Sequence, residues 1–166
     1  MHPTEIVLFW KQSNLLRWPE ALLKNVAIPN SAKLFLVEVG LPSGVDWTLR
    51  FDNATFDLLE KHSGFRQFGY DDATPICFRE TDGAIVAVEI FPMDKVIYLN
   101  ASVEAFGAFL VLYQRYRTGA RQFSEEDILR TIDATENEMH TEDPTALVSP
   151  NNYWSLILEQ MRQGLL

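Results

Sequence analysis

The sequence lacks the residues and segments that several classes of protein require. It has a single cysteine, Cys77, among 166 residues, which rules out an intrachain disulfide framework and a cysteine-rich zinc module. Its longest apolar run, Ala105–Tyr113, covers nine residues, far below the roughly 20 needed to span a bilayer. The first residues also lack the basic segment and cleavage site of a signal peptide. We therefore expect a cytoplasmic protein with no membrane contact.

The sequence motifs of common enzyme classes are missing as well. There is no GxxxxGK[ST], GxGxxG, GxSxG or HExxH pattern, so no phosphate loop, dinucleotide site, hydrolase elbow or zinc protease helix is indicated. Cys77 lies within an apolar strand pattern, away from any helix N-terminus or base that would activate it, and this favours a buried structural thiol. We expect no catalytic residue, metal or cofactor.

Basic residues are scarce in the last quarter of the chain. The whole sequence has a net charge of −9, and residues 123–166 contain 9 acidic against 2 basic residues. An acidic surface repels phosphate backbones and attracts basic proteins, so direct nucleic-acid binding is disfavoured. The alternative is that these charges only keep the protein soluble.

The pattern of apolar residues predicts an α+β fold. The first forty residues are mostly of helical type, with a short helix that Ser31 caps and Gly40 ends. Alternation then predicts five strands, which short connections arrange as an antiparallel meander. The strand segments include Trp47, Leu49 and Phe51, then residues 65–70, 76–81, 84–90 and 95–99. Asp82-Gly83 is typical of a type I′ hairpin turn.

Three helices are predicted after the sheet. Ser102 caps the first, which Gly119 ends, and its buried stripe includes Val103, Phe106, Phe109, Leu110 and Tyr113. Ser124 to Asp127 form a capping-box start for the second, with Ile128, Leu129 and Ile132 as its buried face. The third contains Trp154, Ile157, Leu158 and Met161 at helical spacing and ends at Gly164. The length fits a single domain over residues 1–166.

Five short segments within residues 31–166 together form a family pattern. They are Phe35-Leu36-Val37-Glu38-Val39-Gly40-Leu41-Pro42, Phe68-Gly69-Tyr70-Asp71, Ile76-Cys77-Phe78 with Asp82-Gly83-Ala84-Ile85-Val86, Tyr98-Leu99-Asn100-Ala101-Ser102-Val103-Glu104-Ala105-Phe106, and Trp154 with Gly164-Leu165-Leu166. In order and in register, these segments resemble the SUKH superfamily and within it the fourth subfamily of bacterial immunity proteins. Residues 1–30 match loosely through Trp18 and Glu20, and Ala101 stands where the family usually has the first serine of an Asn-Ser-Ser junction.

This resemblance implies a binding protein that neutralises a cognate polymorphic toxin inside the producing cell. Such toxins are often nucleases or nucleic-acid deaminases, and a basic toxin of this kind would suit an acidic partner that covers its active site. The implied fold is a central antiparallel sheet with flanking N- and C-terminal helices, and we expect a monomer. The predicted partner-binding residues are Asp71, Asp72, Glu125, Glu126, Asp127, Glu136, Glu138, Glu142 and Asp143.

Other interpretations of the same residues remain open. Glu125, Glu126 and Asp127 can simply stabilise a helix N-terminus, and Asp71 with Asp72 can form a polar turn. The protein can also be a regulatory or scaffolding module of the same superfamily with no toxin partner. A third hypothesis is a metal-dependent hydrolase that uses Asp71, Asp72 and His140, where Glu136 and His140 share a helical face at i, i+4 spacing.

Overall fold

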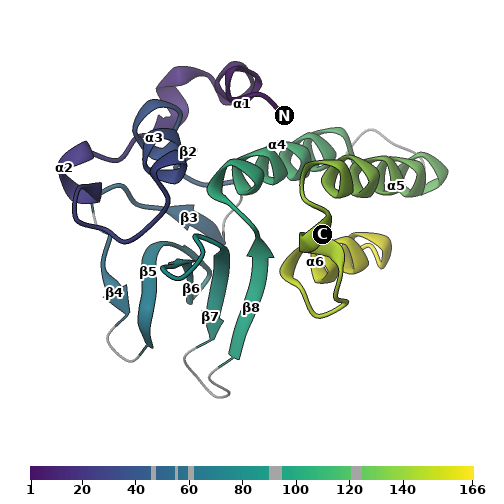
Figure 1. Cartoon of the computed structure of the whole chain (residues 1–166). Helices are drawn as coiled ribbons and strands as arrows, with labels where there is room; N and C mark the ends of the chain where they lie inside the picture. Colours follow the sequence, from purple (N-terminus) through teal and green to yellow (C-terminus); the bar gives the residue numbers. More distant parts are fainter. Residues whose placement is uncertain (46–47, 55, 60–61, 90–94, 121–124) are drawn as a thin grey trace.

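The computed structural model describes residues 1–45, 48–54, 56–59, 62–89, 95–120 and 125–166, with only the backbone of His62, Ala120 and Glu125. The α+β fold class predicted from the sequence is confirmed (Figure 1). The helical elements are α1 (Pro3–Trp10), η1 (Gln12–Asn14), α2 (Glu20–Leu23), α3 (Asn30–Glu38), α4 (Val103–Ala120), α5 (Glu125–Glu142), η2 (Pro144–Leu147) and α6 (Tyr153–Arg162). The strands are β1 (Leu15–Leu16), β2 (Leu41–Pro42), β3 (Leu49–Phe51), β4 (Leu58–Leu59), β5 (His62–Asp71), β6 (Thr74–Arg79), β7 (Ile85–Glu89) and β8 (Lys95–Asn100).

The main sheet is the predicted antiparallel meander. Its strands follow the order β3-β5-β6-β7-β8, and β4 pairs with β5 outside this path. The alternation in β3 is confirmed, since Leu49 and Phe51 are buried while Arg50 is exposed, although Trp47 lies outside the described residues. The two-residue strands β1, β2 and β4 were not predicted, because a segment of that length carries no periodic signal.

The turn between β6 and β7 differs from the predicted type I′. That type needs a positive φ at both central residues, but Gly83 has φ +77 and Asp82 is absent from the positive-φ residues. The amide of Gly83 donates to the Arg79 carbonyl over 2.8 Å, and the Arg79 amide donates to the Ala84 carbonyl over 2.8 Å. The Asp82 carboxylate accepts two hydrogen bonds from the Arg79 guanidinium. The five-residue connection, residues 80–84, is therefore closed by two backbone hydrogen bonds and by a side-chain pair.

Helix α4 forms the centre of the hydrophobic core. All five residues of its predicted stripe are buried, and Phe106 contacts Phe51, Phe68 and Trp154 through its ring. The Ser102 hydroxyl accepts a bond from the Ala105 amide, which confirms the predicted cap. Gly119 does not end the helix, which continues to Ala120, because a single glycine weakens a helix without stopping it.

The other helix boundaries were predicted in part. Helix α3 ends before Gly40, whose φ is +80, as expected. It begins at Asn30 after Pro29, and no side chain caps it, so the predicted cap by Ser31 is wrong. Helix α6 has the predicted buried residues Trp154, Leu158 and Met161.

Helix α5 lies beside α4 and turns inward two of the three residues predicted for its buried face, Ile128 and Ile132. Its buried residues are Ile132, Thr135 and Met139, and Ile128 packs against them. Leu129 is 51% exposed, because it lies about 100° around the helix from Ile128. The predicted capping residue Ser124 lies outside the described residues.

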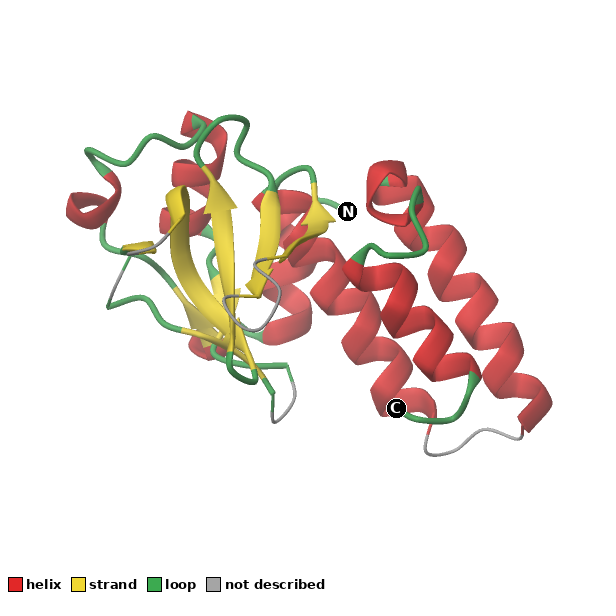
Figure 2. Ribbon diagram, turned by 90° about the horizontal axis from the view of Figure 1, so that it is seen from below, coloured by secondary structure: helices red, strands yellow, loops and turns green. Residues whose placement is uncertain are grey.

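The long helices and the sheet occupy different sides of the molecule. Figure 2 shows the long helices on one side of the strands and shorter helices on the opposite side. Helix α6 contacts both β8 and α5, and η2 contacts β8. Within the described ranges, no helix is long and apolar enough to cross a membrane.

Candidate partner-binding surface

All the predicted acidic residues of the last quarter except Asp143 fall on α5, and they differ in exposure. Glu126, Asp127 and Glu138 are exposed on α5, whereas Glu136 and Glu142 are half-buried. Glu125 begins α5, but its side chain lies outside the described part of the chain. The exposed members can meet a partner directly, and the half-buried ones have partners inside the molecule.

Arg162 connects α5 to α6. Its guanidinium is 3.2 Å from the Asp133 carboxylate and also pairs with Glu136. These two hydrogen bonds raise the pKa of Arg162 above its ordinary value, Glu136 making the larger contribution. Arg162 of α6 therefore holds the side of α5 that carries Asp133 and Glu136.

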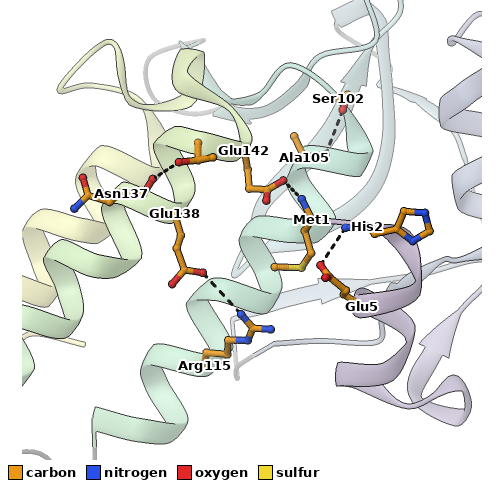
Figure 3. Close-up of polar contacts among 10 residues, drawn as sticks. Met1, His2, Glu5, Ser102, Ala105, Arg115, Asn137, Glu138 and Glu142 are labelled. Carbon is orange, nitrogen blue, oxygen red and sulfur yellow. Dashed lines mark hydrogen bonds and ion pairs between the residues drawn. The ribbon is translucent and has the colours of Figure 1, made fainter.

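Two further pairs connect α5 to other parts of the molecule (Figure 3). Glu142 binds the Met1 ammonium group, and Glu138 lies 3.8 Å from Arg115 on α4. On α5 itself, Glu126 pairs with Arg130 at i, i+4 spacing, where both side chains are more than 70% exposed. Such exposed pairs contribute little to stability, so Glu126 and Glu138 can exchange them for a partner's cations at low cost.

Asp143 lies inside the molecule, which corrects its prediction as a contact residue. The residue is only 4% exposed. Its carboxylate accepts bonds from the Asn100 side chain over 3.1 Å and from the Ala101 amide over 2.8 Å. It also accepts from the Thr145 amide and so caps η2. A sequence signal existed, because Asp before Pro is typical of a helix N-cap.

The Asp71-Asp72 pair forms the turn between β5 and β6. The Asp71 carboxylate accepts a 3.0 Å hydrogen bond from the Tyr153 hydroxyl at the start of α6. Asp72 has φ +52, its amide donates to the Thr48 carbonyl over 2.9 Å, and its side chain is exposed. Asp71 therefore holds α6 against the sheet, and Asp72 points outward from a tight turn.

The structure offers no support for the metal-dependent hydrolase. His140 is exposed on α5. In the part of the chain that the structure describes, no three His, Cys, Asp or Glu side chains gather in a way that would hold a metal ion. Burial raises the pKa of the Cys77 thiol to about 12, so the thiol stays protonated at neutral pH and is a poor nucleophile.

The fold and this surface together define an α+β protein that presents an acidic helix, held by Arg162 and by the Met1 ammonium group. Its sequence matches the model of the SUKH-4 immunity protein family over residues 3–160, and the chain belongs to that family. The match includes the N-terminal helices, which the sequence motifs related only loosely to the family. Neither the curated proteins nor the solved structures gave a match.

Proposed function

We propose that this protein neutralises a cognate polymorphic toxin by stoichiometric binding and does not itself catalyse a reaction. The observation that carries the proposal is membership of the SUKH-4 immunity protein family, together with an exposed acidic helix. A basic nuclease or nucleic-acid deaminase domain, acting in the cytoplasm, is the toxin that this charge would suit.

The contact surface that we propose is the acidic face, defined as Glu126, Asp127 and Glu138 on α5. All three side chains are exposed. Leu129 follows Glu126 by three residues on the same helix and is 51% exposed, so it can act as an apolar anchor beside Glu126, on the side of the helix opposite Glu138. Asp72 forms a smaller second contact, and Glu125 remains a candidate at the start of the helix.

The remaining predicted acidic residues have a supporting role in this proposal. Glu136 and Glu142 brace α5 against α6 and the chain terminus, and Asp71 holds α6. A helix fixed in this way loses little conformational freedom on binding, which favours affinity. The brace therefore presents the acidic face as a rigid surface.

A co-expression assay tests the proposal. The toxin domain encoded beside this chain is expressed in a host cell with and without the chain, and survival is scored. The acidic-face variant, with Glu126→Gln, Asp127→Asn and Glu138→Gln, should protect less well. The matched control changes the same number of exposed carboxylates elsewhere, by Glu20→Gln, Glu38→Gln and Asp57→Asn, and should protect fully.

The same variants show whether electrostatic attraction speeds the association with the toxin, or whether the chain only covers the toxin's active site. Association of the wild-type chain with the toxin domain should slow about tenfold or more between low and high salt, because exposed charges are screened. The acidic-face variant should lose most of this salt dependence. If cells that express the wild-type chain with the toxin die as fast as cells that express the toxin alone, the chain is not an immunity protein for that toxin.

A further inference from the structure

A pocket lies between the end of α1, η1 and the C-terminal half of α4. Its volume is about 530 Å³. The residues that line it combine aromatic, cationic and amide side chains, principally Phe9, Trp10, Lys11, Asn14, Gln114 and Arg115. A few polar groups that converge on an aromatic wall are the usual composition of a recognition pocket.

Two of the pocket residues carry buried polar atoms that lack a hydrogen bond. These atoms are the indole nitrogen Nε1 of Trp10, which is a donor, and the amide oxygen Oε1 of Gln114, which is an acceptor. The other amide atom of Gln114, Nε2, is 3.5 Å from the Thr118 hydroxyl. An unpaired buried polar group is costly, so a bound group that pairs with both atoms after a small shift of the side chains that cover them would be favoured.

Lys11 adds a cation on a strained backbone. Its φ is 62 and its ψ is 138, a conformation that residues other than glycine rarely adopt. Its side chain is exposed and has no acidic partner among the ion pairs of the described residues. Glycine would fit this backbone better, so a lysine here indicates a use for its ammonium group.

Arg115 supplies the second cation. Its guanidinium lies 5.6 Å from the centre of the Phe9 ring, which orients it toward the pocket. Its only carboxylate contact in the described structure is Glu138 at 3.8 Å, with both side chains at least 50% exposed. A contact of that length in water is weak, so the guanidinium can accept another anion.

We propose that this pocket binds an acidic side chain of a protein partner, together with the neighbouring backbone N–H of the same segment. The carboxylate would receive charge-assisted bonds from Lys11 and Arg115 and a bond from the Trp10 indole. The backbone N–H would donate to Gln114 Oε1. A polypeptide supplies both an anion and an adjacent donor, and a protein partner can also carry basic residues that the net charge of −9 attracts. A nucleic acid has a continuous phosphate backbone, which this net charge repels.

This inference rests on the proposed function only for the identity of the partner. The pocket adjoins the acidic face, because Arg115 pairs with Glu138. A toxin would then need a basic surface for α5 and one acidic residue for the pocket. A protein with only basic residues at its surface would bind the acidic face but leave the pocket empty. The pocket would therefore add specificity to the interaction.

A peptide titration followed by nuclear magnetic resonance tests the pocket without any toxin. The probe is hexaglutamate with blocked ends, and the matched control peptide is hexaglutamine with blocked ends. The readout is the indole N–H signal of Trp10, which the variant Trp10→Phe assigns by its disappearance. Hexaglutamate should move this signal in a saturable way, and hexaglutamine should not.

Variants identify the groups responsible. Lys11→Gln with Arg115→Gln should weaken hexaglutamate binding by about tenfold or more, because two charge-assisted bonds are lost. The control Lys24→Gln with Arg130→Gln removes the same charge elsewhere and should bind like wild type. Lys11→Gly should also weaken binding while leaving the melting temperature unchanged or higher, a combination that a merely structural lysine would not produce.

Three results would overturn the inference. The Trp10 signal fails to move with hexaglutamate, or it moves equally with hexaglutamine, or it responds to adenosine monophosphate and not to either peptide. Failure of toxin neutralisation with a normal peptide response would instead reject the proposed function and leave the pocket in place.

Discussion

The indole nitrogen of Trp154 on α6 donates a hydrogen bond of 2.8 Å to the side-chain oxygen of Asn100 at the end of β8. Both residues are fully buried. The amide nitrogen of Asn100 in turn donates to Asp143, which precedes η2. One asparagine thus connects the sheet, the segment after α5 and the last helix. The Asn100 junction singled out in the sequence therefore has a structural role.

Replacement of Asn100 should destabilise the protein strongly. Asn100→Ala leaves the Trp154 indole and one bond of the Asp143 carboxylate unsatisfied in the interior, so we expect a loss of about 2–4 kcal/mol in the free energy of unfolding. Urea denaturation measures this change. The exposed Asn151→Ala is the control and should change stability by less than about 0.5 kcal/mol. Equal stabilities of the two variants would refute the buried network.

Two glycines with a positive φ allow the cost of backbone strain to be measured separately from the cost of a steric clash. A Cβ at Gly83 (φ +77) would lie 2.6 Å from the Pro29 ring, whereas one at Gly64 (φ +91) would meet no atom within 4 Å. Gly64→Ala should therefore cost about 1 kcal/mol from backbone strain alone. Gly83→Ala should cost more, about 2–4 kcal/mol, because the turn must move away from α3. Thermal unfolding of both variants gives the difference, which should vanish if Pro29 does not contact the turn.

The features that could be predicted from the sequence are those that depend on residues close together in the chain. Helix α4 and strands β5–β8 were predicted because apolar periodicity acts over a few residues. Leu129 was assigned to the buried face because it is apolar and directly follows Ile128, and the apolar pattern does not distinguish two adjacent positions. The structural roles of Asp143 and Arg162 could not be predicted, since the groups that they bind lie 42 and 29 residues away in the sequence. The pocket residues Trp10 and Gln114 meet only through the packing of α1 on α4.

The pH dependence of stability should contain a contribution from Asp82. The hydrogen bond from Arg79 lowers the pKa of this carboxyl below its ordinary value of 3.8. The native state therefore binds fewer protons than the unfolded state in this range, and stability falls as the pH drops below about 4. Asp82→Asn should flatten this part of the profile, by less than about 1 kcal/mol because the pair is partly exposed. Melting temperatures from pH 2 to 7 measure the effect, and an unchanged profile would mean that the Arg79–Asp82 pair does not form in solution.

Leu129 should matter for toxin binding and hardly at all for folding. Leu129→Ala removes a side chain that is 51% exposed, so the free energy of unfolding should change by less than about 1 kcal/mol. Affinity for the toxin domain should fall about tenfold or more if the leucine is an anchor beside Glu126 of the acidic face. Leu8→Ala on α1, where the leucine is 75% exposed, is the control and should leave affinity unchanged. Calorimetric titration of the toxin domain compares the two, and equal affinities would remove Leu129 from the interface.

The most direct test of neutralisation by binding is a titration of toxin activity with the purified chain. The toxin domain is held at a fixed concentration well above the dissociation constant, and its activity is measured as the chain is added. The account predicts a linear fall to zero at an equimolar ratio, with toxin recovered intact after the complex is separated. Loss of activity at a small fraction of that ratio, with chemically altered toxin, would show turnover and contradict the account.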